Sequence, residues 1–90
     1  MVIIILEKVP ASLRGELSRW MIEPKSGVFI GKINATVREK LWEMCCRRVR
    51  EGGILQAWRI NNEQGFDLRT YGITSREVIN IDGLKLVRTV

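Results

Sequence analysis

The sequence predicts an α+β fold in which two helices pack on one face of an antiparallel sheet. Two segments carry apolar residues at helical spacing, and short runs rich in β-branched residues surround them. The order along the chain is strand, helix, strand, helix and then strands only. With 90 residues the chain forms one small domain, because two domains would each be too short to build a core.

The first part of the chain supplies three of these elements. Val2–Leu6 is a short β-branched run before a Val9-Pro10 break, which favours a buried strand. Ala11–Ile22 has apolar residues at helical spacing and predicts a helix, which Pro24 would end. Val28–Ile30 lies between two glycines and predicts a second short strand.

The second helix is the best-marked element of the sequence. Thr36 and Glu39 have the spacing of a capping box, in which each side chain bonds the backbone N–H of the other residue. An apolar stripe follows, and the pair Gly52-Gly53 is predicted to stop the helix.

The rest of the chain predicts two hairpins. Ile54–Ile60 and Phe66–Tyr71 are strand-like runs on either side of a polar turn that contains glycine. Val78–Ile81 and Leu84–Arg88 flank Asp82-Gly83, a pair typical of tight turns between short strands.

Together the elements predict a ferredoxin-like sandwich with short strands added at its C-terminus. We expect a core over residues 1–77 and, within the same single domain, a partner-docking extension over 78–90. Five consecutive apolar residues at 2–6 imply burial on both faces of the sheet, whereas two helices can cover only one face. A second copy of the chain is the simplest cover, so we predict a homodimer with sheets packed face to face.

The charge favours binding to a polyanion. The net charge is +5, and arginine, the better bidentate partner for phosphate, outnumbers lysine. Lys8, Arg14 and Arg19 fall at the end of the first strand and along the first helix, and Arg76 lies in a predicted loop. These four are candidates to contact a nucleic-acid backbone. The three arginines between positions 47 and 50 are interpreted instead as cations that suit the end of the second helix.

Two features of the helices leave more than one interpretation open. Gly15 is either a gap that lets a nucleic-acid backbone or partner helix approach, or a tolerated glycine in a fraying turn. Trp20 and Trp42 lie in or beside the apolar stripes, which favours core or interface packing over a role as base-stacking platforms.

The composition excludes several kinds of chemistry. Histidine is absent, which removes histidine bases and histidine metal sites. Cys45 and Cys46 are neighbours and are expected to be free thiols, one in the core and one half-exposed, as in a reducing compartment. The apolar run at the N-terminus is far shorter than the roughly 18 residues that span a bilayer. We therefore expect a cytoplasmic protein with no membrane partner.

Glu7 is the carboxylate best placed for catalysis, because it stands at the C-terminal end of the first strand. One interpretation is a ligand for Mg²⁺, with a two-fold axis bringing in the Glu7 of a second copy. The other is a solvated glutamate at the end of a strand. The residues leave both open.

A series of short motifs resembles one known family over nearly the whole chain. Val9-Pro10 stands at its start and Asp82-Gly83-Leu84-x-Leu86-Val87 near its end, and between them come Leu13-Arg14-Gly15-x-Leu17, Trp20, Gly27-Val28-x-x-Gly31, Arg38-Glu39-x-x-Trp42, Ala57-Trp58, Gly65-Phe66 and Thr70-x-Gly72. Each motif is weak alone, but the ordered series is specific. The chain resembles CRISPR-associated protein 2 of the type I-E systems.

The resemblance implies a ferredoxin-like homodimer in the spacer-acquisition complex, where it bridges dimers of the CRISPR integrase (CRISPR-associated protein 1) and holds duplex DNA. Arg14 and Arg76 match basic sites that contact DNA, while Ser12 and Ser75 stand where some relatives have further arginines. The C-terminal strands of the family dock the integrase, which would involve the apolar residues Val78, Ile79, Ile81, Leu84, Leu86 and Val87.

The wider family is also described as metal-dependent endonucleases acting on RNA or DNA through an acidic residue at the end of the first strand. That position is Glu7, where the broader family favours Asp. The leading hypothesis is a scaffold that binds duplex DNA. The alternative is an endonuclease with Mg²⁺ as cofactor and Glu7 as metal ligand and catalytic residue, and a third is an interaction protein whose charge serves solubility only.

Overall fold

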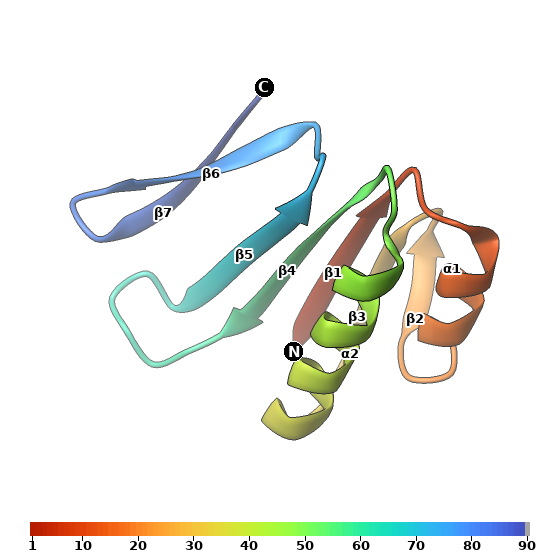
Figure 1. The fold of residues 1–90 in the computed structure, drawn as a ribbon. Helices are drawn as coiled ribbons and strands as arrows, with labels where there is room; N and C mark the ends of the chain where they lie inside the picture. The colour runs from red at the N-terminus through yellow and green to blue at the C-terminus, as the bar shows by residue number, and fades with distance from the viewer. Residues whose placement is uncertain (90) are drawn as a thin grey trace.

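The computed structural model describes residues 1–89, which form the strands and helices drawn in Figure 1. In chain order the elements are β1 (Val2–Glu7), α1 (Ala11–Leu17), β2 (Ile22–Lys25), β3 (Val28–Gly31), α2 (Ala35–Arg48), β4 (Gly53–Arg59), β5 (Phe66–Gly72), β6 (Arg76–Ile81) and β7 (Leu84–Thr89).

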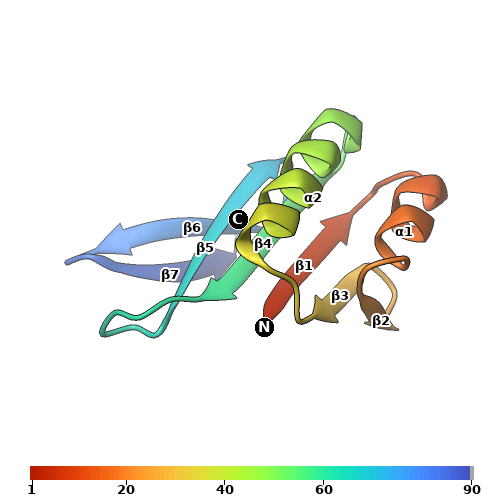
Figure 2. The same cartoon turned by 90° about the horizontal axis from the view of Figure 1, so that it is seen from below.

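Five strands form one antiparallel sheet in the order β2-β3-β1-β4-β5. Both helices lie on the same face of this sheet, as Figure 2 shows. The order β2-β3-β1-β4, with one helix between β1 and β2 and the other between β3 and β4, is ferredoxin-like, and β5 adds an edge strand. The expected α+β sandwich with C-terminal strands is confirmed.

Burial alternates along β1, which lies at the centre of the sheet. Val2, Ile4 and Leu6 face the helices and are buried, whereas Ile3 on the opposite face is 36% exposed and Ile5 is half-buried. A single chain therefore buries the first strand fully on the helix side only. The other face of the sheet remains apolar and partly open to solvent.

The helix expected over 11–22 is wrong at its C-terminal end. The carbonyl of Leu17 accepts bonds from the N–H groups of both Trp20 and Met21, so the chain turns after α1 and enters β2. Met21 then packs in the core beside Gly31, where a methyl group would lie 3.0 Å from the Met21 Cγ. Pro24 lies inside β2 and does not end a helix, because an edge strand tolerates a residue without an N–H.

Both predicted boundary signals of the second helix are also wrong. The N-cap is Asn34, whose side chain accepts a bond of 2.8 Å from the N–H of Val37, and Thr36 lies inside α2. The helix ends at Arg48, before the glycine pair. Gly52 and Gly53 serve a close approach of backbones: a methyl group on Gly52 would lie 2.0 Å from the carbonyl oxygen of Glu7.

Both predicted hairpins are confirmed. β4 and β5 pair along their whole length, and β6 and β7 form a separate two-stranded sheet. Asp82 and Gly83 have φ angles of 51° and 82°, as a two-residue hairpin turn with positive φ at both positions requires. The extension expected over 78–90 contains residue 90, which lies outside the described residues.

The two cysteines are free, with Cys45 buried and Cys46 half-buried, as expected. Burial raises the pKa of the Cys45 thiol to about 12 and also raises the pKa of Cys46. Neither is therefore a reactive thiolate at neutral pH. In the part of the chain that the structure describes, no helix is long and apolar enough to cross a membrane.

Candidate nucleic-acid interface

Basic residues lie around one end of the main sheet, where β1 and β5 end and β4 begins, next to the start of β6. This end of the sheet is uppermost in Figure 1. The basic residues come from two connections, two helices and the first residue of β6, so the fold and not the local sequence brings them together. We call this set the basic edge: Lys8, Arg14, Arg48, Arg50 and Arg76.

Lys8 and Arg50 have the same unusual backbone conformation. Both adopt a left-handed φ, 53° for Lys8 and 51° for Arg50, which disfavours residues that carry a Cβ. Gly52 packs closely against the Lys8 carbonyl. A methyl group on Gly52 would lie only 2.5 Å from the Lys8 carbonyl oxygen. Lys8, Pro10 and Arg50 line a shallow hollow of about 400 Å³ together with Glu51.

Three exposed cations of the basic edge have no internal carboxylate partner. Among residues 1–89, neither Lys8, Arg50 nor Arg76 forms a salt bridge. Lys8, Arg50 and Arg76 are exposed, so each can meet a phosphate without first breaking an ion pair.

Arg14 differs, because part of its side chain is used within the protein. Its Nη1 donates to the Ser26 hydroxyl at 3.1 Å, and its Nε lies 3.8 Å from a carboxylate oxygen of Glu23. That Nε is buried without a hydrogen bond in the described part of the chain. Arg14 therefore fixes α1 on the β2–β3 turn and still exposes 41% of its side chain.

The place of Arg48 and Arg50 in this group was not predicted from the sequence. The arginines of 47–50 were assigned to the end of α2, where the helix dipole explains them. In the structure Arg48 Nη2 also donates to the Ser12 hydroxyl at 3.2 Å, which joins the end of α2 to the start of α1. Only the tertiary arrangement reveals this contact, because the two residues are 36 positions apart.

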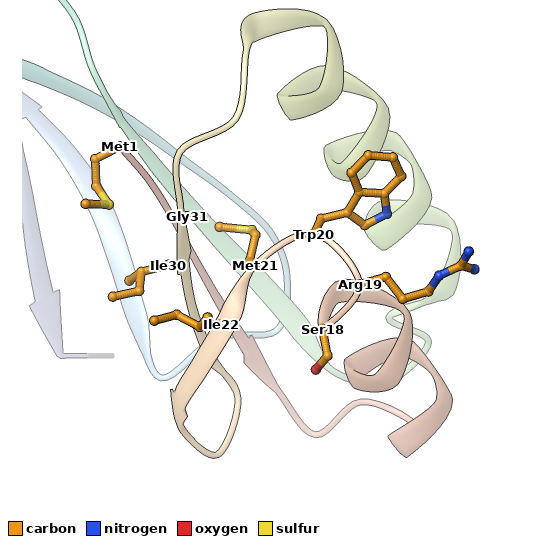
Figure 3. Close-up of a pocket in the computed structure, with 8 residues that line it drawn as sticks. All are labelled: Met1, Ser18, Arg19, Trp20, Met21, Ile22, Ile30 and Gly31. Atoms are coloured by element: carbon orange, nitrogen blue, oxygen red, sulfur yellow. The ribbon is translucent and has the colours of Figure 1, made fainter.

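Arg19 lies in the connection from α1 to β2, at the opposite end of the sheet and away from the other predicted DNA contacts. It pairs with Glu16 at 3.5 Å and borders an apolar hollow of about 430 Å³ (Figure 3). Trp20 lines the same hollow and is 52% exposed, so it does not pack in the core of the single chain, and the interface packing that the sequence also favoured stays a prediction. The structure thus brings together Lys8, Arg14 and Arg76 but not Arg19.

A polar cluster between α2 and the sheet was not foreseen. Gln56 on β4 is fully buried, and its side-chain oxygen accepts bonds of 2.9 and 2.7 Å from the guanidinium of Arg69 on β5. The same guanidinium makes a two-bond contact with Glu39 on α2, at 3.2 and 2.7 Å. This contact, and a weaker one from Arg38, hold the pKa of the Glu39 carboxyl below its ordinary value of 4.5.

Two tryptophans enclose the same guanidinium. The Arg69 Cζ lies 4.3 Å from the ring centre of Trp42 and 4.9 Å from that of Trp58. Trp42 is therefore packed between the helix and the sheet, as the preference for core packing predicted. With its donors directed to Glu39 and Gln56, Arg69 serves the fold and is a poor candidate to bind phosphate.

Glu7 is not placed as a metal ligand in its own chain. Its Oε2 accepts from the N–H of Ser75 at 2.8 Å, and its Oε1 accepts from the Ser75 hydroxyl at 2.7 Å. Over residues 1–89, no three acidic or cysteine side chains gather as a metal would need. The donor set of one chain does not fit Mg²⁺, and the site that would use the Glu7 of a second copy stays a prediction, so we derive no chemical step through a metal here.

The C-terminal hairpin presents an apolar surface. Ile81, Leu84, Leu86 and Val87 are 42–50% exposed, and Val78 and Ile79 are half-buried. The hairpin is attached to the β4–β5 hairpin through Lys85, whose Nζ donates to the Leu68 carbonyl at 3.0 Å and pairs with Asp67. Lys85 also lowers the pKa of the Asp67 carboxyl.

Comparison with known protein families agrees with the fold and the motif series. A family model described as "CRISPR-associated protein (Cas_Cas2CT1978)" matches residues 1–86. The chain belongs to this family. As a CRISPR-associated protein of this family it has a CRISPR-related role, and the match covers the sheet, both helices and β6. The family resemblance predicted from the motifs is confirmed, whereas its type I-E subtype remains a prediction.

Proposed function

We propose that this protein is a type I-E spacer-acquisition subunit, a homodimer that binds the backbone of duplex DNA and bridges dimers of the CRISPR integrase. The basic edge is the observation that carries this proposal. Its exposed, unpaired cations Lys8, Arg50 and Arg76 come from two connections and the first residue of β6, which meet at one end of the sheet. Phosphate contacts of this kind give affinity without sequence preference, as a subunit that holds DNA of any sequence requires.

The open face of the sheet supports the homodimer. Ile3 and Ile5 on β1 have Ile30, Val28 and Leu55 as neighbours in register on the adjoining strands. These side chains lie on the face that carries no helix. A second copy placed on that face would remove them from water and would double the charge of +5. The basic edges of two protomers would then form one longer binding surface.

The apolar hairpin supports docking of the integrase. β6 and β7 pair only with each other in the described chain, so no strand covers the outer edge of β6, which is free for a partner strand. On β7, the Gln64 side chain bonds the N–H and the carbonyl of Lys85. Val78, Ile79, Ile81, Leu84, Leu86 and Val87 supply the apolar contacts. The alternative function, a magnesium-dependent endonuclease that uses Glu7, has no comparable support from the donor set.

The decisive experiment measures duplex binding as a function of salt. Fluorescence anisotropy with a labelled duplex of arbitrary sequence gives the affinity of the wild type and of the double variant Lys8→Ala, Arg76→Ala. We expect the variant to bind more weakly, with a slope of log affinity against log salt smaller by roughly one for each phosphate that the variant no longer binds.

The control is Arg59→Ala. Arg59 ends β4 at the opposite edge, is exposed and has no salt bridge among residues 1–89. It should leave the slope unchanged. If the double variant and the control have the wild-type slope, the basic edge does not bind DNA.

A further inference from the structure

The carboxylate of Glu7 and the residue Ser75 form a closed pair of hydrogen bonds. Each oxygen accepts one bond, from the N–H at 2.8 Å and from the hydroxyl at 2.7 Å. The two residues are 68 positions apart, at the end of β1 and in the connection from β5 to β6. Since both oxygens have a donor from the same residue, the contact fixes Ser75 in position and in orientation.

The backbones around this contact are packed too closely for side chains. A methyl group on Gly53 would lie 2.4 Å from the carbonyl oxygen of Ile73, and one on Gly52 would meet the Glu7 carbonyl. The N–H of Ile73 donates to the Gly52 carbonyl at 3.0 Å. The ends of β1 and β5 and the start of β4 thus form one rigid junction, from which the side chain of Glu7 reaches Ser75.

Arg76 and the C-terminal hairpin continue directly from this junction. Ser75 precedes Arg76, the first residue of β6, and the Thr74 hydroxyl donates to the Arg76 carbonyl. Within residues 1–89, the hairpin has no ladder with the main sheet. Its other attachment lies on β5 and the β4–β5 turn, where Lys85 meets Gln64, Asp67 and Leu68.

We propose that Glu7 is a positioning residue that latches Ser75 and thereby sets the direction of Arg76 and of the β6–β7 hairpin. The contact itself does not depend on the proposed function. Its consequence does rest on the proposed function: one contact then orients both a DNA-binding cation and the integrase-docking strands. The role assigned to Glu7 is thus to accept hydrogen bonds, in place of holding a metal ion.

Two substitutions of Glu7 separate these roles. Glu7→Ala removes both acceptors. Glu7→Gln keeps both bonds, because the amide oxygen accepts from the Ser75 N–H and the amide nitrogen donates to the Ser75 hydroxyl. The neutral amide is a much weaker Mg²⁺ ligand than a carboxylate. A metal ligand would therefore be lost in both variants, whereas the latch would be lost only in Glu7→Ala.

The measurement is amide hydrogen exchange of the free protein, without nucleic acid. In Glu7→Ala we expect exchange at Ser75 and along β6 to accelerate about tenfold or more, with unchanged exchange at Ile4 and Ile54 in the core. Glu7→Gln should restore most of the protection. The Ser75→Ala variant, which keeps the N–H bond and loses the hydroxyl bond, should lie between wild type and Glu7→Ala.

Glu63→Ala, an exposed glutamate in the β4–β5 turn, is the charge-matched control and should exchange like the wild type. Equal loss of protection in Glu7→Gln and Glu7→Ala, or no loss in Glu7→Ala, would overturn the latch. A shift of the wild-type Ser75 amide resonance on adding Mg²⁺, absent in Glu7→Gln, would also overturn it. Since no DNA is present, these outcomes do not depend on whether the basic edge binds a duplex.

Discussion

Arg69 illustrates how one side chain can hold a helix on a sheet. It extends from β5 beneath α2, donates to a carboxylate on the helix and to the buried amide of Gln56, and fills the space between two indole rings. A guanidinium can do this because its donors lie in one plane while its faces stack on aromatic rings. Lysine could replace the charge at this position but not the geometry.

The pair of Glu39 and Arg69 predicts a specific dependence of stability on pH. The pKa of Glu39 is lower in the folded protein than its ordinary value of 4.5, so its contribution is complete above that pH and is lost as the pH falls through the folded value. Thermal or urea unfolding should show the wild type losing up to about 1 kcal/mol more than Glu39→Gln between pH 6 and pH 3. Glu63→Gln, in an exposed turn, should follow the wild type; equal losses in all three proteins would contradict this role.

The sequence offers no signal for this cluster. Glu39 and Gln56 are 30 and 13 positions from Arg69, and only the β4–β5 register places Gln56 opposite it. Glu39 was instead assigned to a capping box, because its spacing from Thr36 satisfies that pattern. Asn34 provides a better cap two residues earlier, which shows that a local pattern does not decide between two competing N-cap residues.

At the scale of elements, glycines of similar appearance have different roles. Gly15 lies in α1 with open space around its Cα, so the structure gives no packing reason for it. Gly52, by contrast, lies where the backbones of β1 and β4 almost touch. The predicted stop of α2 at this glycine pair was wrong because α2 already ends at Arg48 and the pair serves a tertiary approach.

These two glycines give opposite predictions. Gly15→Ala should stabilise the protein by about 0.5 kcal/mol, because alanine restricts the unfolded chain and favours the helix. Gly52→Ala should destabilise it by about 3 kcal/mol, since a methyl group would overlap the Glu7 carbonyl. Urea unfolding measures both. If Gly15→Ala weakens duplex binding while raising stability, Gly15 is the gap for a DNA backbone that the sequence left open.

Strand positions were predicted more reliably than helix ends. β1, β3 and both hairpins follow from short apolar runs bounded by glycine, proline or polar turns. The edge strand β2 was missed because it is short, contains Pro24 and follows apolar residues that continue the helical spacing of α1. Its pairing with β3 overrides that local preference.

At the scale of the whole molecule, neither helix of the described residues covers the second face of the sheet, where Ile3 remains 36% exposed. Only part of the candidate site could be predicted from the sequence, because the rest depends on how the strands are arranged in the sheet. Lys8, Arg14 and Arg76 were named from their places at element ends, but their meeting at one edge, the exclusion of Arg19 and the addition of Arg48 and Arg50 depend on strand order. Strand order is a property of the assembled sheet.

The proposed homodimer leads to a prediction at this scale. Ile3 lies at the middle of the open face, so Ile3→Glu should place a charge at the centre of the interface and weaken association at least about 100-fold. Sedimentation velocity over a concentration series should show a dimer for the wild type and a monomer for the variant. Ile73→Glu, at a side chain that is already 73% exposed and outside the strands, should remain dimeric. A wild type that sediments as a monomer at every concentration would refute the dimer.

The separate two-stranded sheet of β6 and β7 has one more consequence. Because it contributes little to the hydrophobic cluster beneath α1 and α2, its surface is largely decoupled from the cooperative unfolding of that cluster. Substitutions along it can therefore accumulate with little penalty to the rest of the domain. Related proteins could therefore change the partner that this hairpin recognises while keeping the same core.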